Sequence, residues 1–311
     1  MGFNAGAWEL AQVLVKCVVY ACMAASVGGL LVAALLQQQG GGDAVDAAGW
    51  YRQQRRSLLR HVALAASQGL LFTLLLYLLQ VGAILRAGLV GMFDPTFIRA
   101  LAATAVGTGC AAKAAGFVLA LVAVLGVAPR VVGEERRPLP PWLWAAGSAA
   151  LLLFASSFAV LGHVAPLRWP LQLAVMVHVA AVLLWVGALL PLRRLCASGP
   201  LPPLQALLRQ FGMLGWGLVA AVLLGGLTVL WQLVGTVDAL FTTAYGLTLL
   251  SKLLLASGLF ALAALNKFRL VPTLAEPTRD TLRISIGWEL TLALGILALT
   301  AVLTTLTGPP D

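Results

Sequence analysis

The chain is a succession of long apolar runs separated by short polar segments. An α-helix needs about 20 apolar residues to cross a hydrocarbon core ~30 Å thick. Eight runs reach this length, at residues 8–36, 61–85, 98–128, 142–162, 170–192, 211–234, 245–270 and 284–306. The pattern predicts an all-α polytopic membrane bundle of eight transmembrane helices, with no segment of domain size between them.

Composition excludes a soluble globular protein. Hydrophobic residues make up 61% of the chain and charged residues only 10%, which leaves too little polar surface to face water. The N-terminus lacks the basic start of a secretory signal, and its first apolar run is too long for the core of one, so we interpret it as the first span.

The net charge of +9 has a topological meaning. Arginine and lysine gather in alternate loops, and such loops face the cytoplasm under the positive-inside rule. The distribution therefore predicts that both termini are periplasmic, and we expect membrane lipid rather than nucleic acid to meet these charges. The cytoplasmic loops carry Arg52, Arg55, Arg56, Arg60, Arg130, Arg136, Arg137, Arg193, Arg194, Arg209, Lys267, Arg269, Arg279 and Arg283, against Arg86, Arg99 and Arg168 on the other side.

A short motif, T-A-x-G-x5-K, occurs twice, at residues 104–113 and again four spans later at 243–252. An offset of four spans preserves direction through the membrane, so the motif suggests two parallel four-helix repeats. We expect one integral membrane domain in two parts. Residues 1–137 hold the first three spans and their linker, and residues 138–311 hold spans four to eight.

Two of the three histidines are candidates for a functional site. His178 is the single ionisable side chain in the apolar stretch of residues 169–192, and His163 ends the preceding run. An ionisable residue within a membrane is a functional hypothesis by default, and neutral imidazole suits copper, zinc and iron. If the two rings converge, they predict an outer-leaflet metal site. The alternative is that each ring only donates a hydrogen bond to the next helix.

Other polar or aromatic residues extend this hypothesis along a pathway. Counted from the outer ends of their helices, His163, His178 and Lys252 occupy the outer third of the membrane, whereas Glu289 lies nearer the cytoplasm and could receive a cation or proton. Lys252 could instead pair with Glu289, and Trp185 could simply pack. The candidate pathway residues are Ser156, Trp185, Thr248, Lys252 and Glu289.

Nucleotide-binding and hydrolase motifs are absent from the sequence, including a Walker loop, a dinucleotide fingerprint, CxxC, HExxH and a nucleophile elbow. An ATP-driven pump is therefore excluded from our expectations, and we predict no enzymatic activity. Two other hypotheses remain at this point. The histidines could be axial ligands of a haem in a membrane redox protein, or the chain could be an assembly factor without a ligand.

Several sequence segments, taken in their order along the chain, resemble the CopD/PcoD copper resistance proteins of bacterial inner membranes. They are SFAVLGHV from Ser157, HVAAVLLWVGAL from His178, Y-G-x5-K from Tyr245, ALNKFRLVP from Ala264, and the setting of Glu289, and together they define a core of about residues 156–306. The eight-span layout resembles that of the family over the whole chain.

This resemblance implies a multi-pass inner-membrane protein that handles copper and moves it from periplasm to cytoplasm. It also implies a soluble periplasmic copper carrier as partner, and His163 and His178 as copper ligands. The chain departs from the family pattern in having only five methionines, none of them clustered, and no fused periplasmic copper-binding domain. The departure argues against a methionine relay.

Overall fold

A computed structural model describes residues 6–39, 45–133, 138–161, 168–234 and 237–306, and its eight long helices are each long and apolar enough to cross a membrane. The predicted all-α polytopic bundle is confirmed. The long helices are α1 (Ala7–Gln39), α2 (Val45–Leu85), α4 (Ala105–Gly133), α5 (Pro141–Ala159), α6 (Trp169–Ser198), α7 (Leu201–Val234), α9 (Ala244–Leu265) and α10 (Arg279–Leu303).

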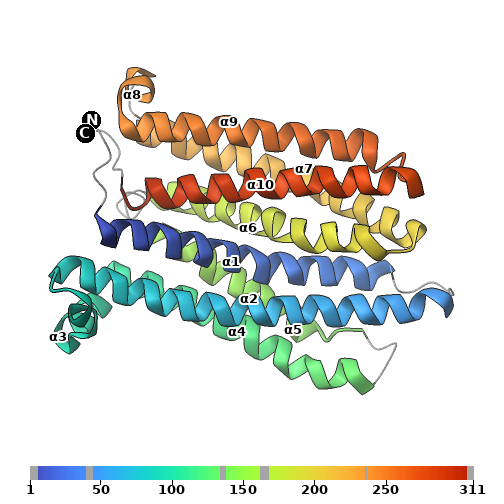
Figure 1. Ribbon diagram of the computed structural model, residues 1–311, viewed down its shortest axis with the longest axis horizontal. Helices are drawn as coiled ribbons and strands as arrows, with labels where there is room; N and C mark the ends of the chain where they lie inside the picture. The colour runs from blue at the N-terminus through green and yellow to red at the C-terminus, as the bar shows by residue number, and fades with distance from the viewer. Residues whose placement is uncertain (1–5, 40–44, 134–137, 162–167, 235–236, 307–311) are drawn as a thin grey trace.

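Short helical turns join several of these spans. They are η1 (Leu89–Phe93), α3 (Pro95–Ala102), α8 (Val237–Thr242), the π-helical turn η3 (Asn266–Leu270) that continues α9, and η4 (Glu276–Thr278). Successive long helices run in opposite directions, so α1 begins and α10 ends at the same end of the bundle (Figure 1).

Helix α1 lies in the middle of the bundle, in contact with α2, α6 and α10 (Figure 1). It is the most buried of the eight described spans, whereas α7 and α9 form an outer edge with few buried residues. Helices α1 and α6 cross so closely that a Cβ added at either Gly28 or Gly187 would run into the backbone of the other helix. Small residues at such a crossing let packing, rather than the hydrophobic effect, hold helices together in lipid.

The third expected span, residues 98–128, is not one continuous helix. Asp94 caps α3, accepting hydrogen bonds from the backbone N–H groups of Thr96 at 2.9 Å and Phe97 at 3.0 Å, and α3 ends at Ala102. Thr104 then starts α4, because its Oγ1 accepts from the N–H of Val106 at 3.2 Å. Sequence length alone missed this break, since an apolar run hides a threonine that caps a helix within it.

The two copies of the T-A-x-G-x5-K motif do the same thing locally. Thr243 caps α9 by accepting from the N–H of Gly246 at 2.9 Å, as Thr104 does at the start of α4. Both helices then run in the same direction through the bundle (Figure 1). The division at residue 137 and the repeat itself remain predictions.

Candidate functional site

His178 projects from α6 toward α7, and its Nδ1 lies 2.8 Å from the carbonyl oxygen of Val222. A carbonyl oxygen can only accept, so Nδ1 carries the proton and Nε2 keeps its lone pair. Gly225 and Gly226 make room for the ring, since a Cβ on either would approach His178 at 2.8 Å and 3.2 Å respectively. The hydrogen bond to the next helix, given above as the alternative to metal binding, is therefore present.

The other expected ligand, His163, lies outside the described residues, which resume at Arg168. Its neighbour on the predicted pathway, Ser156, donates to the carbonyl of Leu153 at 3.0 Å within α5. The structure therefore gives Ser156 a helix-internal bond, and it brings no second described imidazole to His178.

Two further predicted residues lie on α9. Thr248 is buried and donates to the carbonyl of Ala244 at 2.7 Å, one turn earlier on its own helix. Lys252, half-buried one turn further on, is close enough to act electrostatically on His178. A positive charge there opposes a cation beside the imidazole, so Lys252 disfavours cation binding at the predicted outer site.

Trp185 on α6 and Glu289 on α10 are far apart in sequence, but they line the same cavity. This cavity, of about 350 Å³, lies between α6, α7, η3 with the end of α9, and α10. Its wall is mainly apolar and aromatic. Trp185 is buried, and its ring lies 5.5 Å from that of Phe260 between centroids, so two aromatic rings line the cavity that also holds Glu289.

Glu289 finds its partner in Asn266, which the sequence analysis quoted in a motif without giving it a role. The Asn266 amide donates a hydrogen bond to the Glu289 carboxylate, and both side chains are buried. The remaining amide oxygen, Oδ1 of Asn266, is buried without a hydrogen-bond partner. A carboxylate that can accept a proton or a cation and an amide oxygen that can coordinate a cation thus line one small cavity.

A π-helical turn places Asn266 there. The N–H of Val271 donates to the carbonyl of Asn266 at 2.8 Å, five residues back, which widens the end of α9 by one residue. Such turns occur frequently at functional sites because they re-aim a side chain within a helix. A lone amide at the end of an apolar run was the signal in the sequence.

Lys267 also lines the cavity, but its charge is held by α7. Its Nζ donates to the carbonyl of Gly212 and lies 4.2 Å from the ring centroid of Trp216. Within the described residues no salt bridge joins Lys267 or Lys252 to Glu289, so the predicted pairing of Lys252 with Glu289 is not what the structure shows. The acid is instead stabilised by a neutral amide.

The cavity is not a closed metal cage. Among the described residues no three His, Cys, Asp or Glu side chains gather as a metal site. Carboxylate and amide oxygens are hard ligands, whereas Cu(I) prefers sulfur or imidazole. The pair of Asn266 and Glu289 therefore suits a proton, or a cation that passes, better than a tightly stored copper ion.

Comparison with known proteins adds the family. Residues 205–303 match copper resistance protein D, CopD. This match confirms, over these residues, the resemblance seen in the sequence, and the described chain has eight helices long and apolar enough to cross a membrane. No curated protein matches, and no solved structure matches.

The CopD match divides the predicted site. It contains Asn266, Lys267 and Glu289, and it supplies every lining residue of the cavity except Trp185, Leu189 and Leu192 of α6. His178 lies before the matched segment. The cavity, more than the histidine, is thus the part of the site within the recognised CopD segment.

Proposed function

We propose that this protein carries copper across the bacterial inner membrane, from periplasm to cytoplasm. The CopD match and the eight spans support copper handling by a multi-pass membrane protein. The direction rests on the family resemblance. The described segments between spans are short, so we further propose that a separate, soluble periplasmic carrier delivers the copper. We also propose that the protein is a transporter and not an enzyme.

The observation that carries the proposal is the buried Asn266–Glu289 pair in a cavity formed largely by the matched segment. An acid is expensive to bury in a membrane protein and is found there chiefly where ions or protons pass. In this proposal copper moves past the faces of Trp185 and Phe260, which attract a cation, toward the negative charge of Glu289.

The outer site in this proposal is His178, with His163 as the second ligand. Metal-binding histidines commonly donate the other ring N–H to a backbone carbonyl, which fixes the ring and leaves one nitrogen for the metal. The bond from Nδ1 of His178 to Val222 has this form. This bond leaves Nε2 available as a metal ligand, and copper analysis of His178 variants tests that role.

The test is copper transport by purified protein in sealed proteoliposomes, with Cu(I) and Cu(II) supplied separately. Glu289→Gln keeps the size of the side chain and the bond to Asn266 but removes the charge, so transport should fall about tenfold or more. Glu276→Gln is the matched control, since Glu276 is largely exposed beside Arg279, in η4 just before α10. Equal transport by the two variants would remove Glu289 from the pathway.

The haem alternative is tested on the same preparation. A protein with two axial histidines shows a strong Soret absorbance, and our proposal expects none. A stoichiometric Soret band that disappears in His178→Ala would replace the copper proposal with the redox one.

A further inference from the structure

A second and larger cavity, of about 1100 Å³, lies apart from the cavity that holds Asn266 and Glu289. Helix α1 forms its floor, and α2 on one side and α6 with α10 on the other form its walls. The floor is made of small side chains, Ala21, Ala24 and Ala25, which leave the groove wide.

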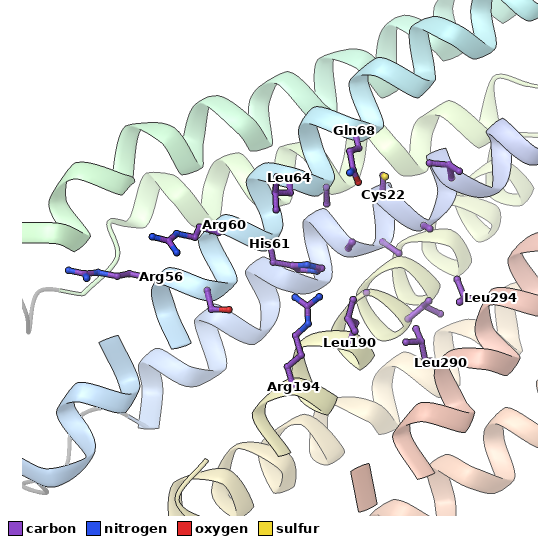
Figure 2. Close-up of a pocket in the computed structure, with 18 of the residues that line it drawn as sticks. Cys22, Arg56, Arg60, His61, Leu64, Gln68, Leu190, Arg194, Leu290 and Leu294 are labelled. Atoms are coloured by element: carbon purple, nitrogen blue, oxygen red, sulfur yellow. The ribbon is translucent and has the colours of Figure 1, made fainter. Parts of the chain in front are cut away.

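One end of this cavity is cationic. Figure 2 shows the guanidinium of Arg194 on α6 and the ring of His61 on α2 pointing toward one another, whereas the Arg60 side chain on α2 extends away from them. The Nε2 atom of His61 is buried without a hydrogen-bond partner. Arg60 and Arg194 make no salt bridge with a described residue. A guanidinium can only donate hydrogen bonds, so Arg194 presents donors at this end of the cavity beside His61.

No acidic side chain occurs among the described residues that line the cavity. Arg52 and Arg56 add positive charge at the same end, although both have interactions of their own. The charge of the described lining therefore favours an anion over a cation. A phosphate fits best, because its oxygens accept from several arginine donors at once.

The other end is apolar and open to lipid. Leu290 and Leu294 of α10 face Leu64 of α2 across the groove, and Leu64 is 64% and Leu294 48% exposed (Figure 2). From His61 to Gln68, which marks the far end on α2, the helix rises roughly 10 Å. A free phosphate would leave this apolar stretch uncovered.

We propose that this groove binds one anionic phospholipid, with the phosphate at Arg194 and His61, Arg60 adding positive charge beside them, and an acyl chain along Leu64, Leu290 and Leu294. The positive-inside bias predicts that the cationic end lies in the cytoplasmic leaflet, where anionic headgroups are attracted to basic side chains. A copper site is disfavoured here because the charges repel a cation. Cys22, the one sulfur in the lining, is seven residues and so roughly 10 Å along α1 from Gly29, which contacts His61.

The experiment is native mass spectrometry of the full chain in detergent, titrated with phosphatidylglycerol, with phosphatidylcholine of the same acyl chains, and with inorganic phosphate. One phosphatidylglycerol should remain bound at voltages that strip phosphatidylcholine. The double variant Arg60→Gln/Arg194→Gln should bind it about tenfold or more weakly. The matched control is Arg209→Gln/Arg269→Gln, two exposed arginines that do not line the groove and are predicted to lie at the same end.

The apolar end is tested separately. Leu294→Gln should weaken phosphatidylglycerol binding, whereas Leu254→Gln, at a 74% exposed position on α9, should not. Equal loss in the groove and control variants, equal retention of phosphatidylcholine, or displacement of the lipid by inorganic phosphate at comparable concentration would each overturn the proposal. Size-exclusion profiles identify any variant that has lost its fold. The conservative double variant Arg60→Lys/Arg194→Lys keeps both positive charges and should retain phosphatidylglycerol binding.

Discussion

The side-chain amide of Asn266 donates to the carboxylate of Glu289 and so joins the π turn after α9 to the middle of α10. This bond links the two buried polar side chains of the candidate site. Its strength and its necessity can be measured separately, because stability and copper transport depend on it in different ways.

Removing one member of this pair should cost more than removing both. Asn266→Leu leaves a buried carboxylate without its donor and should lower the free energy of unfolding by about 1–3 kcal/mol. Asn266→Leu/Glu289→Leu replaces both partners by apolar groups and should recover most of that loss, while copper transport stays absent. Thermal unfolding in detergent measures the cycle, and additive losses would mean that the two side chains are not coupled.

His178 should matter for copper binding more than for folding. His178→Phe keeps a ring against Gly225 and Gly226 but removes both nitrogens, so bound copper per protein should fall, and it should fall to the background level in the double variant with His163→Ala. Metal analysis after equilibration with copper gives the stoichiometry. An unchanged ratio in the double variant would leave His178 with only its structural bond to Val222.

Lys252 should weaken copper binding in the native protein. Its charge acts on His178, so Lys252→Met should raise copper affinity at the outer site. The matched control is Lys113→Met, in which the buried ammonium removed lies 5.9 Å from the ring centroid of Phe158. Competition with a copper chelator measures both variants, and a drop in affinity for Lys252→Met would point instead to a direct role of the amine.

The α1–α6 crossing should be sensitive to a single methyl group. Gly28→Ala inserts a Cβ against the backbone of Gly187 and should lower the unfolding temperature, because backbone on both sides cannot move aside. Gly215→Ala is the control, since no atom lies within 4 Å of its added Cβ. We expect it to be neutral or stabilising by up to ~1 kcal/mol, as alanine is the better helix former. Thermal unfolding of the two variants under one condition decides this.

The sequence predicted the spans well because each must satisfy its own backbone hydrogen bonds in lipid, which makes apolar length a strong signal. It missed the break before Thr104, where α3 ends at the C-cap Ala103 and Thr104 caps the start of α4 within one apolar run. The capping role shared by Thr104 and Thr243 was not predicted from the motif and became visible only in the structure.

The candidate site was only partly predictable for a different reason. Glu289 and Trp185 could be chosen singly, as an acid and an aromatic residue in apolar surroundings. The partnership with Asn266 depends on a π turn and on which helices are neighbours, and neither is written in local periodicity. The engagement of Lys267 by Gly212 and Trp216 likewise required the position of α7.

The central position of α1 has a consequence for biosynthesis. Lys16 donates to the carbonyl of Thr304 at 2.9 Å and to Thr305 Oγ1 at 2.8 Å, and Gly28 fits against Gly187. Helix α1 leaves the ribosome first, yet these partners are synthesised in the second half of the chain. Until these partners are synthesised, the Lys16 ammonium and the backbone at Gly28 lack their final contacts. Maturation of the bundle is thereby tied to completion of translation.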